Sequence, residues 1–229
     1  MYNKDTQACS YCGFASFCTL DVQGSQWVNQ VNPAVSRQHV LKKNLPLYVP
    51  QTSFHSLYVI KSGCLKTYEI DKDGNELLRG FYFPGEILGL EAIAGGHYLY
   101  STAALSNALV CEISYTHFCE LLRAHPGLQQ QVLYLVSQQL GIGSYLNFVT
   151  AEQRLAAFLI DLSKRLVACE QRLEFVLPMS RQDIGNYLRL TAETVSRLFT
   201  QFRNNEIISV EHKKIRLLQL DQLKSIGRI

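Results

Sequence analysis

The sequence predicts an α+β protein that combines an N-terminal antiparallel β-roll, one long helix and a C-terminal winged helix-turn-helix. Short β-rich runs separated by Gly, Pro, Asp and Asn fill residues 31–118. An apolar stripe at helical spacing follows, and the rest of the chain has the order helix, strand, helix, turn, helix, hairpin. The expected segments are a cysteine-rich segment (1–30), the roll (31–122), the long helix (123–150) and the winged helix-turn-helix (151–229).

Composition places the chain among folded proteins of the cytoplasm. Hydrophobic residues make up 47% of its 229 residues, which is enough to bury substantial cores. No apolar run approaches the roughly 18 residues of a membrane span, and the opening "MYNKDTQA" lacks the apolar core of a signal peptide. In a reducing compartment, the seven cysteines are expected to be ligands or buried thiols rather than disulfides.

Positive charge is concentrated in the last third of the chain. Residues 151–229 carry 13 Lys and Arg against nine Asp and Glu, whereas residues 1–150 carry nine against ten. A small basic domain suggests a nucleic-acid partner.

The predicted roll rests on runs such as "SLYVIKSG", "CLKTYEI" and "ELLRGFYF". The Asp-Gly step within residues 71–76 is typical of a hairpin turn, and residues 83–86, "FPGE", predict a second turn. Many short strands joined by regular turns favour an antiparallel barrel or roll.

The long helix carries an apolar stripe whose members alternate in steps of four and three. Such a stripe is typical of a seam between two copies of a chain, although it also fits the buried face of a monomeric helix. Gly141 and Gly143 lie within it, and each costs about 1 kcal/mol in a helix interior. The predicted dimer seam is Leu128, Val132, Leu135, Gln139, Ile142, Leu146 and Val149.

Two helix starts define the predicted helix-turn-helix. Ser180 with Asp183 forms a pattern like a capping box, and Thr191 can cap the following helix. The inward side of that second helix is predicted to comprise Val195, Leu198, Phe199 and Phe202.

Glu193, Ser196 and Arg197 are then expected on the opposite, exposed face. Glu accepts from cytosine N4, Arg forms a bidentate pair with guanine, and Ser contacts several bases, each good pair discriminating by about 1–3 kcal/mol. Alternatively, Glu193 and Arg197 form an ordinary i,i+4 ion pair. The candidate phosphate contacts, which are also candidates for plain surface charges, are Arg181, Arg189, Arg203, Lys213 and Lys214.

The stretch "CSYCGFASFC" gathers Cys9, Cys12 and Cys18 near the N-terminus. Thiolates hold iron–sulfur clusters or zinc, and structural zinc sites more often pair two Cys knuckles. Only one knuckle is present, so the spacing favours iron–sulfur, with zinc and unliganded thiols as alternatives. Buried structural roles are expected for Cys64, Cys119 and Cys169.

Several motifs resemble the CRP/FNR superfamily of bacterial transcription regulators, and its oxygen-sensing FNR branch in particular. They are "SLYVIKSG", "GFYFPGEILGLEAI", "LVCEI", "AEQRLAAF" and "RQDIGNYLRLTAETVSRL". The resemblance implies a roll of the cyclic-nucleotide-binding type and a homodimer that binds a TTGAT-like inverted repeat through Glu193, Ser196 and Arg197. It also implies a [4Fe–4S] cluster held by Cys9, Cys12, Cys18 and Cys111, and contact with RNA polymerase.

Cyclic nucleotide binding is not expected. The cyclic-nucleotide branch uses an Arg-Ser pair in the roll, and the matching place here is Tyr98-Leu99. No Lys or Arg occurs from residue 80 to residue 122, so a buried phosphodiester would lack a cationic partner.

The predicted dimer helix differs from the FNR pattern because it has no acidic residue near the seam. This favours, as an alternative, a constitutively dimeric zinc or iron–sulfur regulator with weak or no oxygen gating. Enzyme activity is not expected, since the sequence has no GxGxxG motif, nucleotide loop or second cysteine motif.

Overall fold

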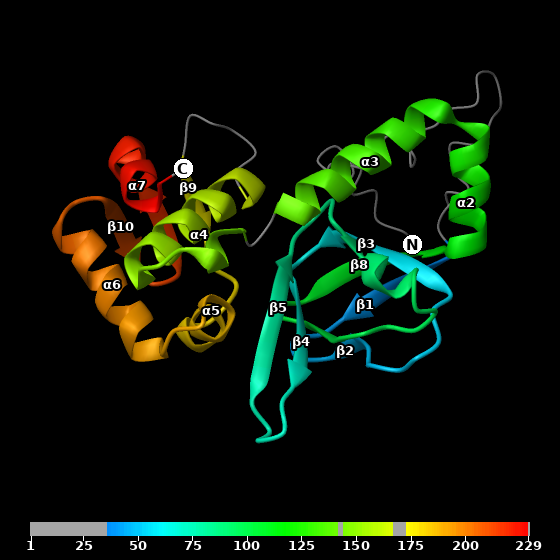
Figure 1. Ribbon diagram of the computed structural model, residues 1–229, viewed down its shortest axis with the longest axis horizontal. Coiled ribbons are helices and arrows are strands. Elements are labelled where there is room, and N and C mark those ends of the chain that lie inside the picture. Colours follow the sequence, from blue (N-terminus) through cyan, green and yellow to red (C-terminus); the bar gives the residue numbers. More distant parts are fainter. Residues whose placement is uncertain (1–35, 142–143, 167–172, 229) are drawn as a thin grey trace, which may run out of the picture. The chain divides into compact units, whose positions relative to one another are not determined.

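The computed structural model describes residues 36–141, 144–166 and 173–228 (Figure 1). The chain divides into two compact units, residues 1–68 with 81–139 and residues 69–80 with 140–229. The predicted cysteine-rich segment, 1–30, lies outside the described residues.

Two four-stranded antiparallel sheets form the roll, with strand orders β1-β8-β3-β6 and β2-β7-β4-β5. The predicted turns at residues 71–76 and 83–86 are confirmed by bonds from Gly74 N–H to the Asp71 carbonyl and from Glu86 N–H to the Phe83 carbonyl, both 3.1 Å. A short 3₁₀ helix, Leu90–Ala92, follows β6. The strands are β1 (Arg37–Leu41), β2 (Pro46–Tyr48), β3 (Ser56–Ser62), β4 (Leu65–Ile70), β5 (Glu76–Tyr82), β6 (Ile87–Leu88), β7 (Ser101–Ala104) and β8 (Ala108–Ser114).

Strand β8 pairs with both β1 and β3, so both of its edges are hydrogen-bonded, and core residues cover both of its faces. Successive side chains of a strand point to opposite faces. Val110 belongs to the core inside the roll, and Ile113 belongs to a second core beneath the helices. By this alternation, Cys111 shares the face of Ile113, and Glu112 shares the inner face of Val110.

Helices α2 (Tyr115–Ala124) and α3 (Pro126–Gly141) cover the face that carries Ile113. Leu128 and Val132 are only 6% and 8% exposed, packed with Leu57, Val59 and Phe118 of the same unit. Gln139 donates from Nε2 to the Ile87 carbonyl at 2.8 Å. The first half of the predicted dimer seam, Leu128, Val132, Leu135 and Gln139, therefore packs against the roll of its own chain.

A helix is present where the stripe begins, but the single helix predicted over 123–150 does not continue through this whole range. His125 separates α2 from α3, and α3 extends to Gly141. Leu146 lies in a 3₁₀ helix (Ser144–Asn147), and Val149 lies beyond it and is exposed. Ile142 lies outside the described residues. The last described residue of α3 is Gly141, and glycines lower helix stability.

The second unit has the predicted order of a winged helix-turn-helix, with one further helix at its end. Phe158, Ile184, Val195 and Phe202 are fully buried in its core. None of the helices in the described part of the chain is long and apolar enough to cross a membrane. Its elements are α4 (Ala151–Leu166), β9 (Glu174–Val176), α5 (Arg181–Leu188), α6 (Ala192–Asn204), β10 (Ile208–Glu211), β11 (Lys214–Leu217) and α7 (Leu220–Gly227), and its sheet has the order β10-β11-β9.

The turn between α5 and α6 depends on Gly185. A Cβ on this residue would lie 2.7 Å from the Leu190 carbonyl oxygen, closer than real Cβ atoms come to any such atom. Leu190 N–H in turn donates to the Gly185 carbonyl at 2.9 Å. The two helices can approach this closely only where the side chain is absent.

We expect Gly185→Ala to destabilise the second unit by about 2 kcal/mol or more, because the added methyl group collides with rigid backbone. Thermal unfolding followed by circular dichroism measures this loss. Gly127→Ala is the control, since nothing lies within 4 Å of a Cβ placed at Gly127. Equal unfolding temperatures for Gly185→Ala and the unaltered protein would contradict the requirement for glycine.

Candidate functional site

Helix α6 presents its polar residues together on one exposed face. Thr191 caps the helix by accepting from Thr194 N–H at 3.1 Å, and Val195, Phe199 and Phe202 are buried beneath it. Glu193, Ser196 and Arg197 are all exposed near its N-terminal end, as predicted from their spacing. Within the described residues, no ion pair joins Glu193 to Arg197, so both remain available to another molecule.

The Ser196 hydroxyl already uses its proton in a hydrogen bond within α6. Its Oγ donates to the Ala192 carbonyl one turn earlier at 2.8 Å. With its proton engaged in this way, Ser196 presents lone pairs to the outside and favours a donor on its partner.

Arg181 differs from an ordinary surface charge. Its guanidinium lies over the Phe199 ring of α6, 3.3 Å from the ring centroid. Burial lowers the pKa of Arg181 to about 10, so it stays charged at neutral pH. Its Nη1 is buried and has no hydrogen-bond partner among the described residues, which leaves one donor unsatisfied.

The other predicted phosphate contacts fall into two groups. Arg189, Arg203 and Lys213 are exposed, at the turn after α5, in the last turn of α6 and in the hairpin turn respectively. Lys214 instead pairs with Glu174 at 2.6 Å, and Arg216 pairs with the same carboxylate at 2.6 Å. Hydrogen bonds from Lys214 and Arg216 lower the pKa of Glu174.

Two contacts that the sequence analysis missed join α4 to the helix-turn-helix. Arg154 donates from Nη1 to the Leu188 carbonyl at 2.8 Å, and Gln201 donates from Nε2 to Glu152 at 3.2 Å. Neither pair is close in sequence, so no local pattern indicates them.

Cys111 is the one predicted cluster ligand among the described residues, since Cys9, Cys12 and Cys18 lie outside them. Its thiol is buried on β8, and Gln38 of β1 donates from Nε2 to Sγ at 3.9 Å. The described residues contain no group of three or more metal-binding side chains. Cys64 is also buried, whereas Cys119 is half-buried, and Cys169 lies outside the described residues.

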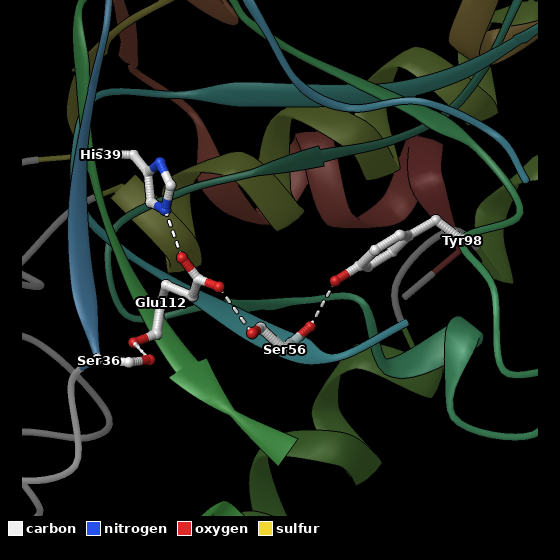
Figure 2. Close-up of polar contacts among 5 residues, drawn as sticks. All are labelled: Ser36, His39, Ser56, Tyr98 and Glu112. Carbon is white, nitrogen blue, oxygen red and sulfur yellow. Dashed lines mark hydrogen bonds and ion pairs between the residues drawn. The ribbon is translucent and has the colours of Figure 1, made fainter. Parts of the chain in front are cut away.

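Glu112, the neighbour of Cys111, holds three strands and the start of the described chain together (Figure 2). Its carboxylate binds His39 of β1 at 2.6 Å and accepts from Ser56 Oγ of β3 at 2.7 Å. Ser36 N–H donates to the Glu112 carbonyl at 2.9 Å, and the Tyr98 hydroxyl donates to the Ser56 carbonyl at 2.7 Å. Burial alone would raise the pKa of Glu112, but the bonds from His39 and Ser56 lower it overall.

The contacts around Cys111 are compatible with the implied cluster. Ser36, the first described residue, is bonded to Glu112, the neighbour of Cys111. Cys18 lies 18 residues earlier, and an extended chain covers about 3.3 Å per residue, so the N-terminal cysteines can reach Cys111. A buried thiol with an amide donor at its sulfur suits an iron–sulfur ligand.

The inner face of the roll opens on a cavity of about 420 Å³, lined in part by Tyr48, Tyr58, Tyr98 and Glu112. Tyr48 and Tyr98 stack with their ring centroids 4.0 Å apart. No Lys or Arg is among its lining residues, and Glu112 supplies negative charge. His55 is the one basic side chain in this lining.

Comparison with known proteins shows which protein family the chain resembles. Residues 38–125 match the cyclic nucleotide-binding domain, and residues 153–226 match the Crp-like helix-turn-helix domain. The chain is 36% identical to the anaerobic regulatory protein of Haemophilus influenzae, over 94% of this chain and 86% of that protein. It is 34% identical to the fumarate and nitrate reduction regulatory protein of Escherichia coli K12, over 96% and 90%.

Solved structures agree with this match. FixK2 from Bradyrhizobium japonicum superposes with a TM-score of 0.73 at 25% identity, covering 83% of this chain and 96% of that one. TTHB099, a CRP-family transcriptional regulator from Thermus thermophilus, gives a TM-score of 0.64 at 20% identity, covering 84% and 97%, which supports the fold alone.

A β-roll joined to a Crp-like helix-turn-helix defines a class of DNA-binding transcription regulators, and its relatives are regulators rather than enzymes. The chain belongs to the CRP/FNR family, and FNR and Anr anaerobic regulators are among its relatives at 34–36% identity.

The exposed Arg189 gives a direct test of a phosphate contact. It adopts a left-handed conformation (φ 56°), which costs a non-glycine residue about 1–2 kcal/mol. We expect Arg189→Gly to stabilise the protein by about 0.5–1 kcal/mol, and to reduce the slope of log K for DNA binding against log salt by about 0.9. Thermal unfolding and DNA titrations at several salt concentrations measure the two effects.

Arg228→Gly is the matched control, because Arg228 has the same conformation (φ 52°) after α7. It should bring a similar gain in stability with no change in salt slope. An unchanged slope for Arg189→Gly would show that Arg189 makes no phosphate contact.

Proposed function

We propose that this protein is an oxygen-responsive transcription regulator that carries a [4Fe–4S] cluster and binds, as a homodimer, an inverted repeat of TTGAT-like half-sites. The observation that carries the proposal is the joint exposure of Glu193, Ser196 and Arg197 on the capped helix α6. FNR-type relatives support the redox part of the proposal.

Each of the three exposed residues suits a base edge. Glu193 accepts from the cytosine N4 amino group, and Arg197 donates to guanine O6 and N7. Ser196 acts as an acceptor because its proton is bonded to Ala192, so it suits an amino group of adenine or cytosine. A half-site with one G·C pair among A·T pairs offers all of these partners.

Phosphate contacts would come from the cations around this face. Arg189, Arg203 and Lys213 are exposed, whereas the guanidinium of Arg181 is partly buried against the Phe199 ring. Lys214 would first have to leave Glu174, which makes it the weakest of the predicted contacts. Phosphate contacts fix the position of the protein on DNA without reading sequence.

The dimer would use the outer face of α3 rather than the predicted stripe. Leu133, Tyr134 and Leu140 are 67%, 63% and 82% exposed, and their helical spacing places them on the side away from Leu128 and Val132. An apolar helix face of this size is suited to pairing with its copy in a second subunit. Two-fold pairing of subunits matches an inverted repeat, with half-sites about one DNA turn apart.

Cys9, Cys12, Cys18 and Cys111 would hold the cluster, which supplies an oxygen-sensitive redox state when bound. Glu112 fixes the strand of Cys111 through His39 and Ser56, and Gln38 donates to the Cys111 sulfur. Through the outer face of β8, the cluster would be coupled to the packing of α3 and so to dimerisation.

A second candidate is a constitutively dimeric regulator that holds zinc or a cluster without oxygen gating. The observation that favours it is that α3, "PGLQQQVLYLVSQQLG", contains no acidic residue to oppose pairing. The proposal further includes a cytoplasmic location and contact with RNA polymerase through exposed turns, such as the Asp71–Asn75 turn.

Purification without oxygen tests the proposal. We expect a broad visible absorption band that bleaches in air, together with protection of both halves of a TTGAT inverted repeat in footprinting. Glu193→Ala and Arg197→Ala should each weaken that binding by about 1–3 kcal/mol per half-site, because each removes one base contact from each half-site. Cys111→Ser should lose the band.

The readouts separate the two candidates. Equal DNA binding by cluster-free protein supports the constitutive dimer and rejects oxygen gating. Absence of protection in every form rejects the proposed DNA site altogether.

The dimer face has its own test. Leu133→Asp should raise the dimer dissociation constant at least tenfold, since two-fold symmetry places the charge in the interface twice. Sedimentation of the anaerobic protein measures it, and circular dichroism should show that the variant remains folded. Ile70→Asp, at another exposed apolar residue (56%), is the control. A dimer unaffected by Leu133→Asp would exclude this face of α3.

A further inference from the structure

Arg154 connects the start of α4 to the turn of the helix-turn-helix. Helix α4 begins with reciprocal caps, in which Gln153 N–H donates to Thr150 Oγ1 at 3.1 Å and Thr150 N–H donates to Gln153 Oε1 at 3.2 Å. These caps fix the first turn of α4, so Arg154 projects from a rigid base. From there its Nη1 donates to the Leu188 carbonyl at 2.8 Å.

The accepting carbonyl belongs to the last residue of α5. Carbonyls at the end of a helix lack partners within it and carry partial negative charge. The Gly185 carbonyl already accepts from both Arg189 N–H and Leu190 N–H, which closes the turn. Arg154 satisfies the Leu188 carbonyl with a charge-assisted bond, so the end of α5 is anchored from outside the helix-turn-helix.

The same turn of α4 also contacts α6. Glu152 accepts from Gln201 Nε2 at 3.2 Å, and Gln201 lies on the C-terminal half of α6. One helical turn therefore contacts the end of α5 and the side of α6. Contacts of this kind constrain the angle between the two helices, and with it the direction in which Glu193, Ser196 and Arg197 point.

Arg154 is poorly explained by stability alone. Its Nε is buried and has no hydrogen-bond partner in the described part of the chain. A buried donor without a partner is destabilising, and an apolar side chain of similar length would avoid that cost. The hydrogen bond from Arg154 to the Leu188 carbonyl therefore has a role other than stabilising the folded unit.

We propose that Arg154 is a positioning residue for DNA recognition: it fixes the α5–α6 angle and thereby the discrimination between operator and random DNA. This inference rests on the proposed DNA-binding function and names a residue that touches no DNA itself. Without the Arg154 bond, α6 keeps its charged side chains, but Glu193, Ser196 and Arg197 are no longer held in the orientation that matches the base edges.

The test compares Arg154→Met, Arg154→Lys and Arg165→Met in the full-length dimer, well below the unfolding temperature. Arg165 is the matched control, because it lies on the same helix and pairs with Asp161 at 3.0 Å. Affinity for a TTGAT inverted repeat and for random DNA of equal length is measured for each variant.

Arg154→Met should weaken operator binding about tenfold or more and leave random-DNA binding within about twofold. Arg154→Lys should recover part of the loss, and Arg165→Met should keep the ratio of the two affinities. An unchanged ratio in Arg154→Met, even with a lower unfolding temperature, overturns the positioning role. If the unaltered protein does not distinguish operator from random DNA, the proposed function fails and the inference with it.

Discussion

The structure depends on strand β8, which is covered on both faces. Val110 packs into the interior of the roll, and Ile113 packs beneath α2 and α3, so neither face can be altered without affecting a core. Cys111 and Glu112 occupy the positions between them. Glu112 fixes the inner side of this strand through His39 and Ser56, so a change at the Cys111 sulfur acts first on the core beneath α2 and α3.

Local patterns in the sequence predicted much of the fold, because the interactions concerned are short in range. The Ser180–Asp183 capping box, the Thr191 cap and the turn at Asp71 each join residues two to four positions apart, and each is confirmed. Placement of Glu193, Ser196 and Arg197 on one face likewise follows from helical spacing once Val195 and Phe199 are buried. Family resemblance supplied what spacing cannot, namely the match of Cys111 to a distant cysteine run.

Long-range contacts account for what the sequence did not predict. An apolar stripe identifies a buried helix face but does not show which part of the protein packs against it. Here the roll of the same chain packs against Leu128 and Val132. The apolar stripe continues in the sequence beyond Gly141, whereas α3 is described only as far as this glycine, a weak helix former. Arg154 and Leu188 are 34 positions apart, and the stacking of Arg181 on Phe199 likewise requires the packed helices, so neither contact has a local signal.

The two faces of α3 have a consequence for how such proteins diverge. Leu128 and Val132 are constrained by the roll of their own subunit, whereas Leu133, Tyr134 and Leu140 contribute little to the fold of a single chain. Substitutions on the outer face can therefore accumulate without unfolding the subunit. If the proposed dimer forms through this face, paralogues within one cell can in this way acquire incompatible surfaces and avoid forming mixed dimers, while their remaining domains stay unchanged.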